Sequence, residues 1–280
     1  MLRTCFILGN LTTAHDECRV FVLETAGAIE QLLGLLEQLC EQSFRESERE
    51  EGKADSSVDE TLVKLIRLIA NLAINEEVGM MVSQEPSAML LCRVIESKSL
   101  AEQEELVLNA VSAITNLSFY PQPLNAVLHH ETIAELLVPL LLHDNHEAKV
   151  EAARCYGNLS RYPEVRRLMK SKRVDEILCI LLDHPQQSVL VAVCGVLMNV
   201  AADPLFRRGL AEYHAVQKLI AVLEQLSLTL DDLPLATLLC KTFFNLALTP
   251  TEGGADAAVM SSGEAGAPPP PLAHLRLARN

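Results

Sequence analysis

The fold is decided by a four-residue stretch, Gly157-Asn158-Leu159-Ser160, because its pattern recurs along most of the chain. An asparagine followed by leucine or valine and then by a small residue occurs five more times: Gly9-Asn10-Leu11-Thr12, Ala70-Asn71-Leu72-Ala73, Thr115-Asn116-Leu117-Ser118, Met198-Asn199-Val200-Ala201 and Phe244-Asn245-Leu246-Ala247. The last five asparagines are 41 to 46 residues apart, whereas the first two are 61 apart. A period of this size is typical of stacked groups of helices, and the longer first spacing indicates a charged insertion.

The residues before each asparagine predict which side of the segment is buried. Two positions before it the residue is always large: Leu8, Ile69, Ile114, Tyr156, Leu197 and Phe243. Five positions before it stand Cys5, Ile66, Val111, Ala153, Cys194 and Cys240. At about 100° per residue, these positions and the leucine after the asparagine gather on one side of a helix, and the asparagine lies across from them. We therefore predict that each copy ends a helix with a buried stripe and a polar ridge.

Prolines and polar turns predict the rest of each repeat. Proline stands five residues after the asparagine in four copies, as Pro121, Pro163, Pro204 and Pro250. Proline is disfavoured inside a helix but suits its first turn. A short amphipathic stretch follows, then a leucine-rich helix such as 177–182, then a turn such as 184–187 that leads into the long helix. The sequence thus predicts an all-α array of three-helix repeats, about five full and one partial.

Composition excludes several classes of protein. The chain is 49% hydrophobic and 21% charged, which is too apolar for a disordered protein. Its net charge of −14 argues against a broad basic surface for nucleic acid. No apolar run is long enough to insert into a membrane, and the first residues do not resemble a signal peptide. The eight cysteines are scattered without a CxxC pair, which favours free thiols and a reducing, cytoplasmic setting.

Two segments are expected to lie outside the helices of the array, which we place at residues 1–248. Residues 41–60 hold eight acids and three bases, and we predict an acidic loop insertion there, with a phosphoregulated docking segment as the alternative. Residues 249–280 are rich in glycine and proline, and we predict a disordered tail. The array begins within a signature helix and meets the tail without a polar capping helix, so we expect a fragment or variant of a longer array, or ends that bind a partner.

Motifs of enzymes are missing from the sequence. It contains no GxxxxGK[ST], GxGxxG, GxSxG or HExxH string. The pair His143 and His146 has a spacing that could hold a metal, but no third ligand stands nearby in sequence, and an exposed turn is the favoured interpretation. We expect a protein with no enzymatic activity, no cofactor, no metal and no small-molecule substrate.

With this ending, period and order of helices, residues 1–248 resemble the armadillo family, with HEAT repeats as a near neighbour. The resemblance implies a right-handed solenoid whose third helices line a concave groove, where the signature asparagine hydrogen-bonds the backbone of an extended ligand. Carried over by position, the ligand-binding residues are Asn71, Asn116, Asn158, Asn199 and Asn245. The alternative is that these asparagines tie adjacent repeats together. The copies 155–160 and 6–12 also resemble a ciliary and flagellar member of the family, which implies a role in assembling the axoneme and a place in the cilium or flagellum.

Basic residues share the face of the asparagines. Arg67, Arg154 and Lys241 stand four residues before an asparagine, and Lys64 stands seven before Asn71. Nuclear-import armadillo adaptors carry tryptophan at the former position, and this chain has no tryptophan. The face is more similar to the acidic-ligand groove of the catenin branch, so we predict a protein partner that offers an extended acidic segment. The alternatives are solvated charges of little energy, or a transport adaptor or regulatory subunit that binds through its convex or terminal surfaces.

Overall fold

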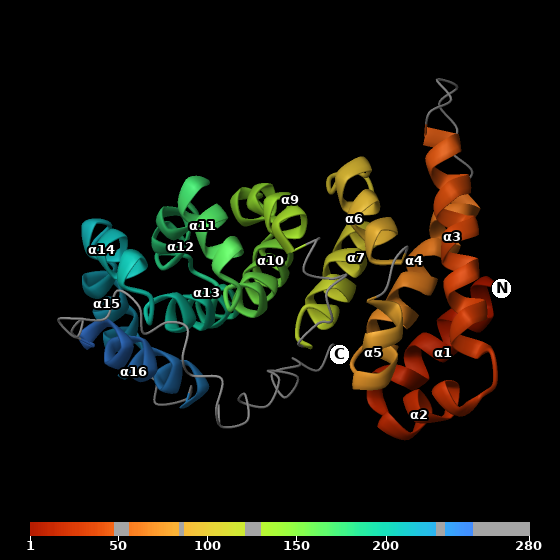
Figure 1. Ribbon diagram of the computed structural model, residues 1–280, viewed down its shortest axis with the longest axis horizontal. Helices are drawn as coiled ribbons and strands as arrows, with labels where there is room; N and C mark the ends of the chain where they lie inside the picture. Colours follow the sequence, from red (N-terminus) through yellow and green to blue (C-terminus); the bar gives the residue numbers. More distant parts are fainter. Residues whose placement is uncertain (48–55, 84–86, 121–129, 228–232, 249–280) are drawn as a thin grey trace.

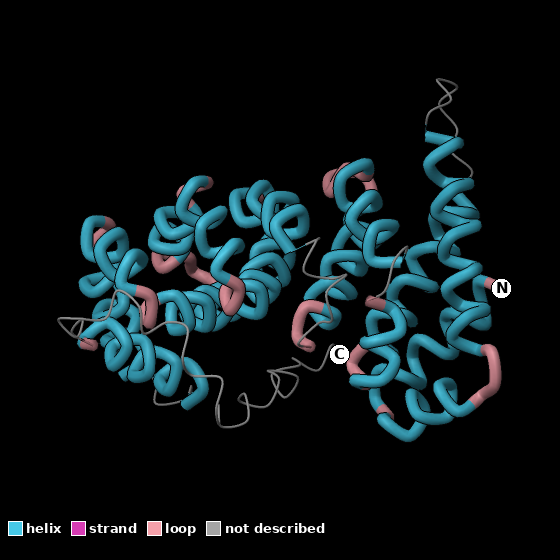
Figure 2. The backbone as a smooth tube through the Cα atoms, viewed as in Figure 1, coloured by secondary structure: helices cyan, strands magenta, loops and turns pink. Residues whose placement is uncertain are grey.

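The computed structural model describes residues 1–47, 56–83, 87–120, 130–227 and 233–248. Within these ranges the chain forms fifteen helices and no strand (Figures 1 and 2). The helices are α1 Leu2–Ala14, α2 Asp16–Glu24, α3 Ala28–Ser47, α4 Ser56–Leu72, α5 Glu76–Val82, α6 Ser87–Ser97, α7 Glu104–Leu117, α9 His130–Leu142, α10 His146–Leu159, α11 Pro163–Ser171, α12 Val174–Leu181, α13 Gln187–Val200, α14 Pro204–Glu212, α15 Ala215–Ser227 and α16 Leu233–Ala247. No helix in the described part of the chain is both long and apolar enough to cross a membrane.

The helices stack in rows that run along the molecule (Figure 1). The helices that end in the asparagine signature, α1, α4, α7, α10, α13 and α16, pack each against the next and form one row. Helices α3, α6, α9 and α12 pack in a second row behind them, and α15 packs against α16. The short helices α2, α5, α11 and α14 connect one repeat to the next. The grouping in threes is the predicted one, with α1 as the partial repeat. The predicted order of lengths fails in two repeats, because α3 with 20 residues is longer than α4 with 17, and α12 with 8 residues is shorter than α11 with 9.

The core between the rows is the stripe that the sequence predicts. At the position two before the asparagine, Ile69, Ile114, Tyr156 and Leu197 are buried, whereas Leu8 and Phe243 are half-buried. Tyr156 donates its hydroxyl to the carbonyl of Ala134 in α9, which satisfies the one polar atom of this side chain. Burial of these aliphatic stripes drives the stacking, since an isolated repeat has no other surface to bury.

Proline begins the short helices, as expected from its fixed φ. Pro163 and Pro204 occupy the first turns of α11 and α14. Pro121 and Pro250 lie outside the described residues, and so does the predicted tail 249–280. The turn between the first and second helices of these two repeats uses a left-handed residue at the same place, Arg173 and His214, each with φ of 56°.

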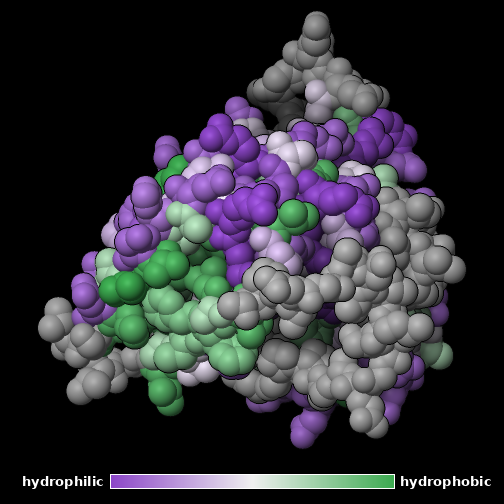
Figure 3. Space-filling view, turned by 60° about the vertical axis from the view of Figure 1, so that its left-hand side comes forward, coloured by the Kyte–Doolittle hydropathy of each residue, from purple (hydrophilic) through white to green (hydrophobic). Residues whose placement is uncertain are grey.

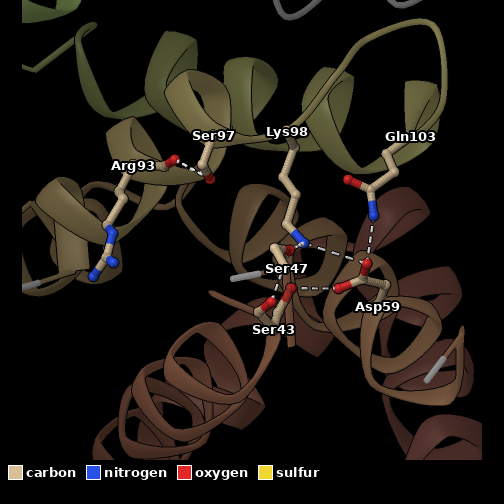
Figure 4. A network of polar contacts seen from close by, with 7 residues as sticks. All are labelled: Ser43, Ser47, Asp59, Arg93, Ser97, Lys98 and Gln103. Atoms are coloured by element: carbon tan, nitrogen blue, oxygen red, sulfur yellow. Dashed lines mark hydrogen bonds and ion pairs between the residues drawn. The ribbon is translucent and has the colours of Figure 1, made fainter. Parts of the chain in front are cut away.

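The prediction of a loop at 41–60 is wrong at both ends. Helix α3 continues to Ser47 and α4 begins at Ser56. Of the stretch 41–60, only residues 48–55 lie outside the described residues. The polar side chains that suggest a loop are bonded between repeats (Figure 4). Ser43 donates to Asp59 Oδ1 at 2.5 Å, and Lys98 Nζ donates to Ser47 Oγ at 2.9 Å and to Asp59 Oδ2 at 3.4 Å. Gln103 also donates to Asp59, so this network joins α3 and α4 to the following repeat.

Candidate functional site

The row of signature helices encloses an open groove with a volume of about 1200 Å³. Its walls come from α7, α10, α13 and α16 and from the turns that follow α4, α7 and α10. Six of the nine residues predicted to bind a partner line it: Asn116, Arg154, Asn158, Asn199, Lys241 and Asn245. Lys64, Arg67 and Asn71 do not line this groove, so the structure brings together only the residues of the later repeats.

The asparagines form a ladder between neighbouring repeats. Each side-chain Nδ2 donates to the carbonyl of the residue just before the asparagine of the preceding repeat. The bonds are Asn71 to Gly9 at 2.9 Å, Asn116 to Ala70 at 2.8 Å, Asn158 to Thr115 at 3.0 Å, Asn199 to Gly157 at 2.8 Å and Asn245 to Met198 at 2.7 Å. Four of these five carbonyls lie in the last turn of a helix, where the helix itself supplies no donor. The ladder therefore satisfies helix ends and fixes how adjacent repeats sit.

This geometry decides between the two roles considered for the asparagines. The nitrogen of each amide ties adjacent repeats, which is the structural alternative. The oxygen is different, because no hydrogen bond among the described residues uses Oδ1, and the five side chains are half-buried or exposed. An amide can donate and accept at once. The nitrogen of each amide is already bonded, so the oxygen is the atom left to bind a ligand, by accepting a hydrogen bond from an N–H of an extended chain.

Two of the four predicted cations already hold a carboxylate. Lys64 Nζ lies 2.8 Å from Glu105 Oε1, in a separate hollow lined by several acids. Arg154 Nη1 lies 2.9 Å from Glu151 Oε1, one turn earlier in α10. Among the described residues no ion pair involves Arg67 or Lys241, and Lys241 is exposed. Of the four predicted cations, Arg67 and Lys241 therefore have no carboxylate partner among the described residues, and of these two only Lys241 lines the groove.

Sequence reasoning missed two further cations of the groove, Arg161 and Arg166. Arg161 is exposed, and its Nε donates to the carbonyl of Asn158 at 2.7 Å. Arg166 donates to the carbonyls of Ser160 and Arg161 at the end of α10 and lies 2.9 Å from Asp203. Arg207 caps the end of α13 in the same way. The signal is present in the sequence, since Arg166 and Arg207 each stand eight residues after an asparagine.

The groove as a whole is basic. Among the described residues its lining holds four bases, Arg154, Arg161, Arg166 and Lys241, and no aspartate or glutamate. Two of these bases, Arg154 and Arg166, are paired with Glu151 and Asp203 just outside the lining, so the unpaired positive charge of the groove is that of Arg161 and Lys241. The whole chain by contrast has 37 acids and 23 bases. Low-dielectric walls lined by one sign of charge concentrate the field in a cleft. The groove is therefore an anion-attracting surface on an acidic protein.

Aromatic and small residues shape the groove between these cations. Phe119 and Tyr120 pack edge to face with ring centroids 5.3 Å apart, and the Tyr120 hydroxyl donates to the carbonyl of Ile74. Burial raises the pKa of Tyr120 to about 12, so its hydroxyl remains a donor near neutral pH. Gly157 and Gly195 leave the floor open, because a Cβ added at either position would meet no atom within 4 Å. Such a surface can hold both the backbone and the large side chains of a peptide.

The thiols and histidines near the array have structural roles. Burial raises the pKa of Cys40, Cys92, Cys155, Cys179 and Cys194 to about 12, so these thiols stay neutral and pack as apolar groups. Asn145 caps α10 by accepting from Ala148 N, and His143 Nδ1 accepts from Asn145 N. This is the turn predicted for the stretch from His143 to His146. In the described ranges, no group of three or more histidine, cysteine or acidic residues could hold a metal.

The comparisons with known proteins agree with this fold. No family model matches the chain. The chain is 37% identical over 250 residues to armadillo repeat-containing protein 2 of Mus musculus and 35% identical over 256 residues to the Homo sapiens protein of that name. Each match covers 88% of this chain and 29% of the relative, so the chain spans less than a third of these relatives.

Solved structures of designed and engineered repeat proteins are also similar. An engineered protein superposes with a TM-score of 0.66 at 22% identity, covering 88% of this chain and 91% of that one. A designed armadillo repeat protein in complex with the peptide (KR)4 superposes with a TM-score of 0.64 at 20% identity, covering 88% and 91%. The armadillo-type solenoid predicted from the asparagine repeats is thereby confirmed.

Proposed function

We propose that this chain, an armadillo-repeat solenoid similar in sequence to armadillo repeat-containing protein 2, is a non-enzymatic scaffold that binds an extended acidic segment of a protein partner. The observation that carries the proposal is the charge of the groove. Within the described part of the chain, four bases and no acid line it, and two of the bases, Arg161 and Lys241, have no carboxylate partner there, although acids outnumber bases by 14 in the whole chain. An acidic segment gains from this field, whereas a basic one is repelled.

The ladder of asparagines supplies the backbone contacts of the proposed complex. An extended strand offers unpaired N–H groups. Asn116, Asn158, Asn199 and Asn245 line the groove, and their amide oxygens have no hydrogen-bond partner among the described residues. Packed helices lie about 8–10 Å apart, and an extended chain advances about 3.3 Å per residue. One asparagine therefore serves every third residue of the ligand. Lys241 and Arg161, which lack a carboxylate partner among the described residues, then pair with acidic side chains.

The likeness to designed peptide binders supports this mode of binding but not the charge. The designed protein with the peptide (KR)4 holds a basic ligand in its complex, and another similar structure is described as designed for modular peptide recognition. The groove of our chain is itself lined by basic residues, so it is not expected to hold a basic peptide. We therefore propose the same extended ligand geometry with an acidic sequence.

We place the scaffold in assembly of the axoneme of cilia or sperm flagella, with a cytoplasmic and ciliary location. This part rests on the resemblance of the copies 155–160 and 6–12 to a ciliary and flagellar member of the armadillo family. A tagged chain expressed in ciliated cells is expected to enrich with axonemes, and to lose this enrichment when the groove is reversed in charge. Diffuse cytosolic signal for both forms would contradict this placement.

Charge reversal tests the groove directly. The variant Arg154→Glu, Arg161→Glu, Lys241→Glu changes the groove charge, and the matched control Arg3→Glu, Arg167→Glu, Arg208→Glu changes exposed bases outside it by the same amount. Fluorescence anisotropy with a labelled glutamate–serine peptide is expected to show at least tenfold weaker binding for the groove variant only. Equal losses in both variants would mean non-specific attraction. Loss only in the control would favour the alternative, an adaptor that binds through surfaces outside the groove.

A further inference from the structure

At the position four residues before the asparagine, the three repeats along the groove carry a cation, a glycine and a second cation. These residues are Arg154 in α10, Gly195 in α13 and Lys241 in α16. The ladder bonds of Asn199 to Gly157 and of Asn245 to Met198 set the register of these three helices. Each of the three residues stands one helical turn before its asparagine. The register of the ladder therefore places Gly195 of α13 between Arg154 of α10 and Lys241 of α16. The three residues thus form a row in which a missing side chain separates two cations.

The gap over Gly195 is not needed for packing. A Cβ added there would meet no atom within 4 Å, so no neighbouring helix requires the glycine. Glycine also weakens a helix interior relative to alanine. A residue that costs stability and serves no packing contact is consistent with space kept open for a ligand.

The residues around this gap are mostly apolar. Ala192, Met198, Leu238 and Phe244 line the groove on α13 and α16, the helices that carry Gly195 and Lys241, together with the polar Asn199 and Thr237, and no acid in the described ranges lines it. Phe244 and Leu233 are 67% and 78% exposed, which is a high exposure for large apolar side chains. Figure 3 shows apolar side chains gathered on the lower part of this end of the array, where α15 and α16 lie. The gap is therefore an apolar recess between two positive charges.

We propose that the recess over Gly195 receives a large apolar side chain of the bound segment, while acidic residues on both sides of it pair with Arg154 and Lys241. The inference deepens the proposed function and rests on it. Arg154 keeps donors for a second carboxylate while it holds Glu151, because a guanidinium carries five N–H groups. Lys241 has no carboxylate partner among the described residues.

The spacing of the ligand follows from the helices. Two helix spacings of about 8–10 Å separate Arg154 from Lys241, and both side chains are long enough to reach toward the recess. An extended chain advances about 3.3 Å per residue and turns alternate side chains to the same face. Two helix spacings, about 16–20 Å, correspond to five or six residues of an extended chain. Because both long side chains lean toward the recess, their charged groups come closer than their backbones, and acidic residues four apart, about 13 Å, with leucine or phenylalanine midway on the same face, fit the row. This pattern names the partner as a segment with both acidic and apolar residues.

A peptide of this pattern tests the recess. The probe is an end-blocked, fluorescein-labelled Ser-Glu-Ser-Leu-Ser-Glu-Ser, and its affinity is measured by anisotropy. Gly195→Leu fills the recess, and Gly34→Leu is the matched control, because a Cβ at Gly34 in α3 also meets no atom within 4 Å and Gly34 is outside the groove. We expect at least tenfold weaker binding for Gly195→Leu and no change for Gly34→Leu. Thermal melts followed by circular dichroism establish that both variants fold.

A second peptide separates filling of the recess from a general disturbance. Replacing the leucine of the probe by serine is expected to weaken binding to the native chain tenfold, and to have no further effect on Gly195→Leu. The inference is overturned if Gly195→Leu binds within twofold of the native chain, or if both peptides bind the native chain equally. If charge reversal at Arg154, Arg161 and Lys241 abolishes binding in that case, the proposed function stands and only the recess fails. A probe that binds no better than its lysine analogue overturns both.

Discussion

Removing the amide of Asn158 is expected to loosen the boundary between α7 and α10. Its Nδ2 donates to the carbonyl of Thr115 at 3.0 Å and to Ser118 Oγ at 3.1 Å. A neutral hydrogen bond contributes about 0.5–1.5 kcal/mol of net stability. Two bonds give about 1–3 kcal/mol, and because the site is half-buried, water can replace part of this. We therefore expect Asn158→Ala to lower the free energy of unfolding by ~2 kcal/mol.

The charged variant is expected to be at least as damaging. In Asn158→Asp the donor becomes an oxygen that faces the lone pairs of the Thr115 carbonyl, so an attraction becomes a repulsion. Asn199→Ala provides a graded comparison, because Asn199 is exposed and its side chain makes one hydrogen bond among the described residues, to the carbonyl of Gly157 at 2.8 Å. It is expected to lose about half as much, ~1 kcal/mol.

Urea unfolding followed by helical circular dichroism measures these losses. In a repeat array, weakening one boundary also lowers cooperativity, so hydrogen exchange should show the repeats on either side of α7 and α10 opening separately. The reasoning is refuted if Asn158→Ala unfolds at the same urea concentration as the native chain, or if Asn199→Ala costs more than Asn158→Ala. Either result would mean that the ladder does not hold the repeats together.

Other positions give independent predictions. Gly79→Ala should destabilise the chain by about 1–3 kcal/mol, because the new Cβ would lie 2.6 Å from the Tyr120 ring, while Gly195→Ala should leave the melting temperature unchanged or raise it. Asp59→Ala should cost about 3–5 kcal/mol in a urea melt, because it leaves the buried ammonium of Lys98 without its carboxylate, and Lys98→Met should cost less. Burial raises the pKa of five core thiols from 9.0 to about 12, so unfolding releases protons above pH 9 and stability should fall as the pH rises from 9 toward 12. At pH 8, a thiol reagent should label exposed Cys240 well before these five, and mass spectrometry of the labelled peptides checks the order.

The sequence predicts those features of the fold that depend on residues close together in the chain. The period of the asparagines and the large residue two before each one define the helices, the rows and the face that carries the groove. Composition alone misread 41–60, since the partners of Ser47 and Asp59 are Lys98 and Gln103, which stand 39 to 51 residues further along. The sequence also does not predict the pairing of Lys64 with Glu105, because these two residues are 41 positions apart.

Six of the nine candidate residues that the sequence selects line one groove, but the sequence says less about the chemistry of that groove. Charge at each position can be read from the sequence, but whether a cation is neutralised depends on which helix turns its acids toward it. Lys64 illustrates this, because its partner Glu105 stands 41 residues further along the chain, in α7. The pair of Arg154 and Glu151, by contrast, is an i,i+3 pair within α10 that helical spacing alone predicts. The commitment of the asparagine nitrogens also depends on the register between repeats, which no single repeat encodes. Arg161 and Arg166 lie in the turn after α10 and in the short helix α11, outside the long helices whose residues the asparagine pattern aligns.

At Asn116, Asn158, Asn199 and Asn245, the amide that anchors the neighbouring repeat also belongs to the lining of the groove. If the groove binds as proposed, natural selection cannot change these four positions for a new ligand without also weakening the scaffold that presents it. Gly195 and Lys241, one turn earlier, do not have both roles. A Cβ at Gly195 would meet no atom within 4 Å, and the side chain of Lys241 is exposed. We expect descendants of this chain to diversify their partners at those positions, on a backbone whose asparagines stay constant.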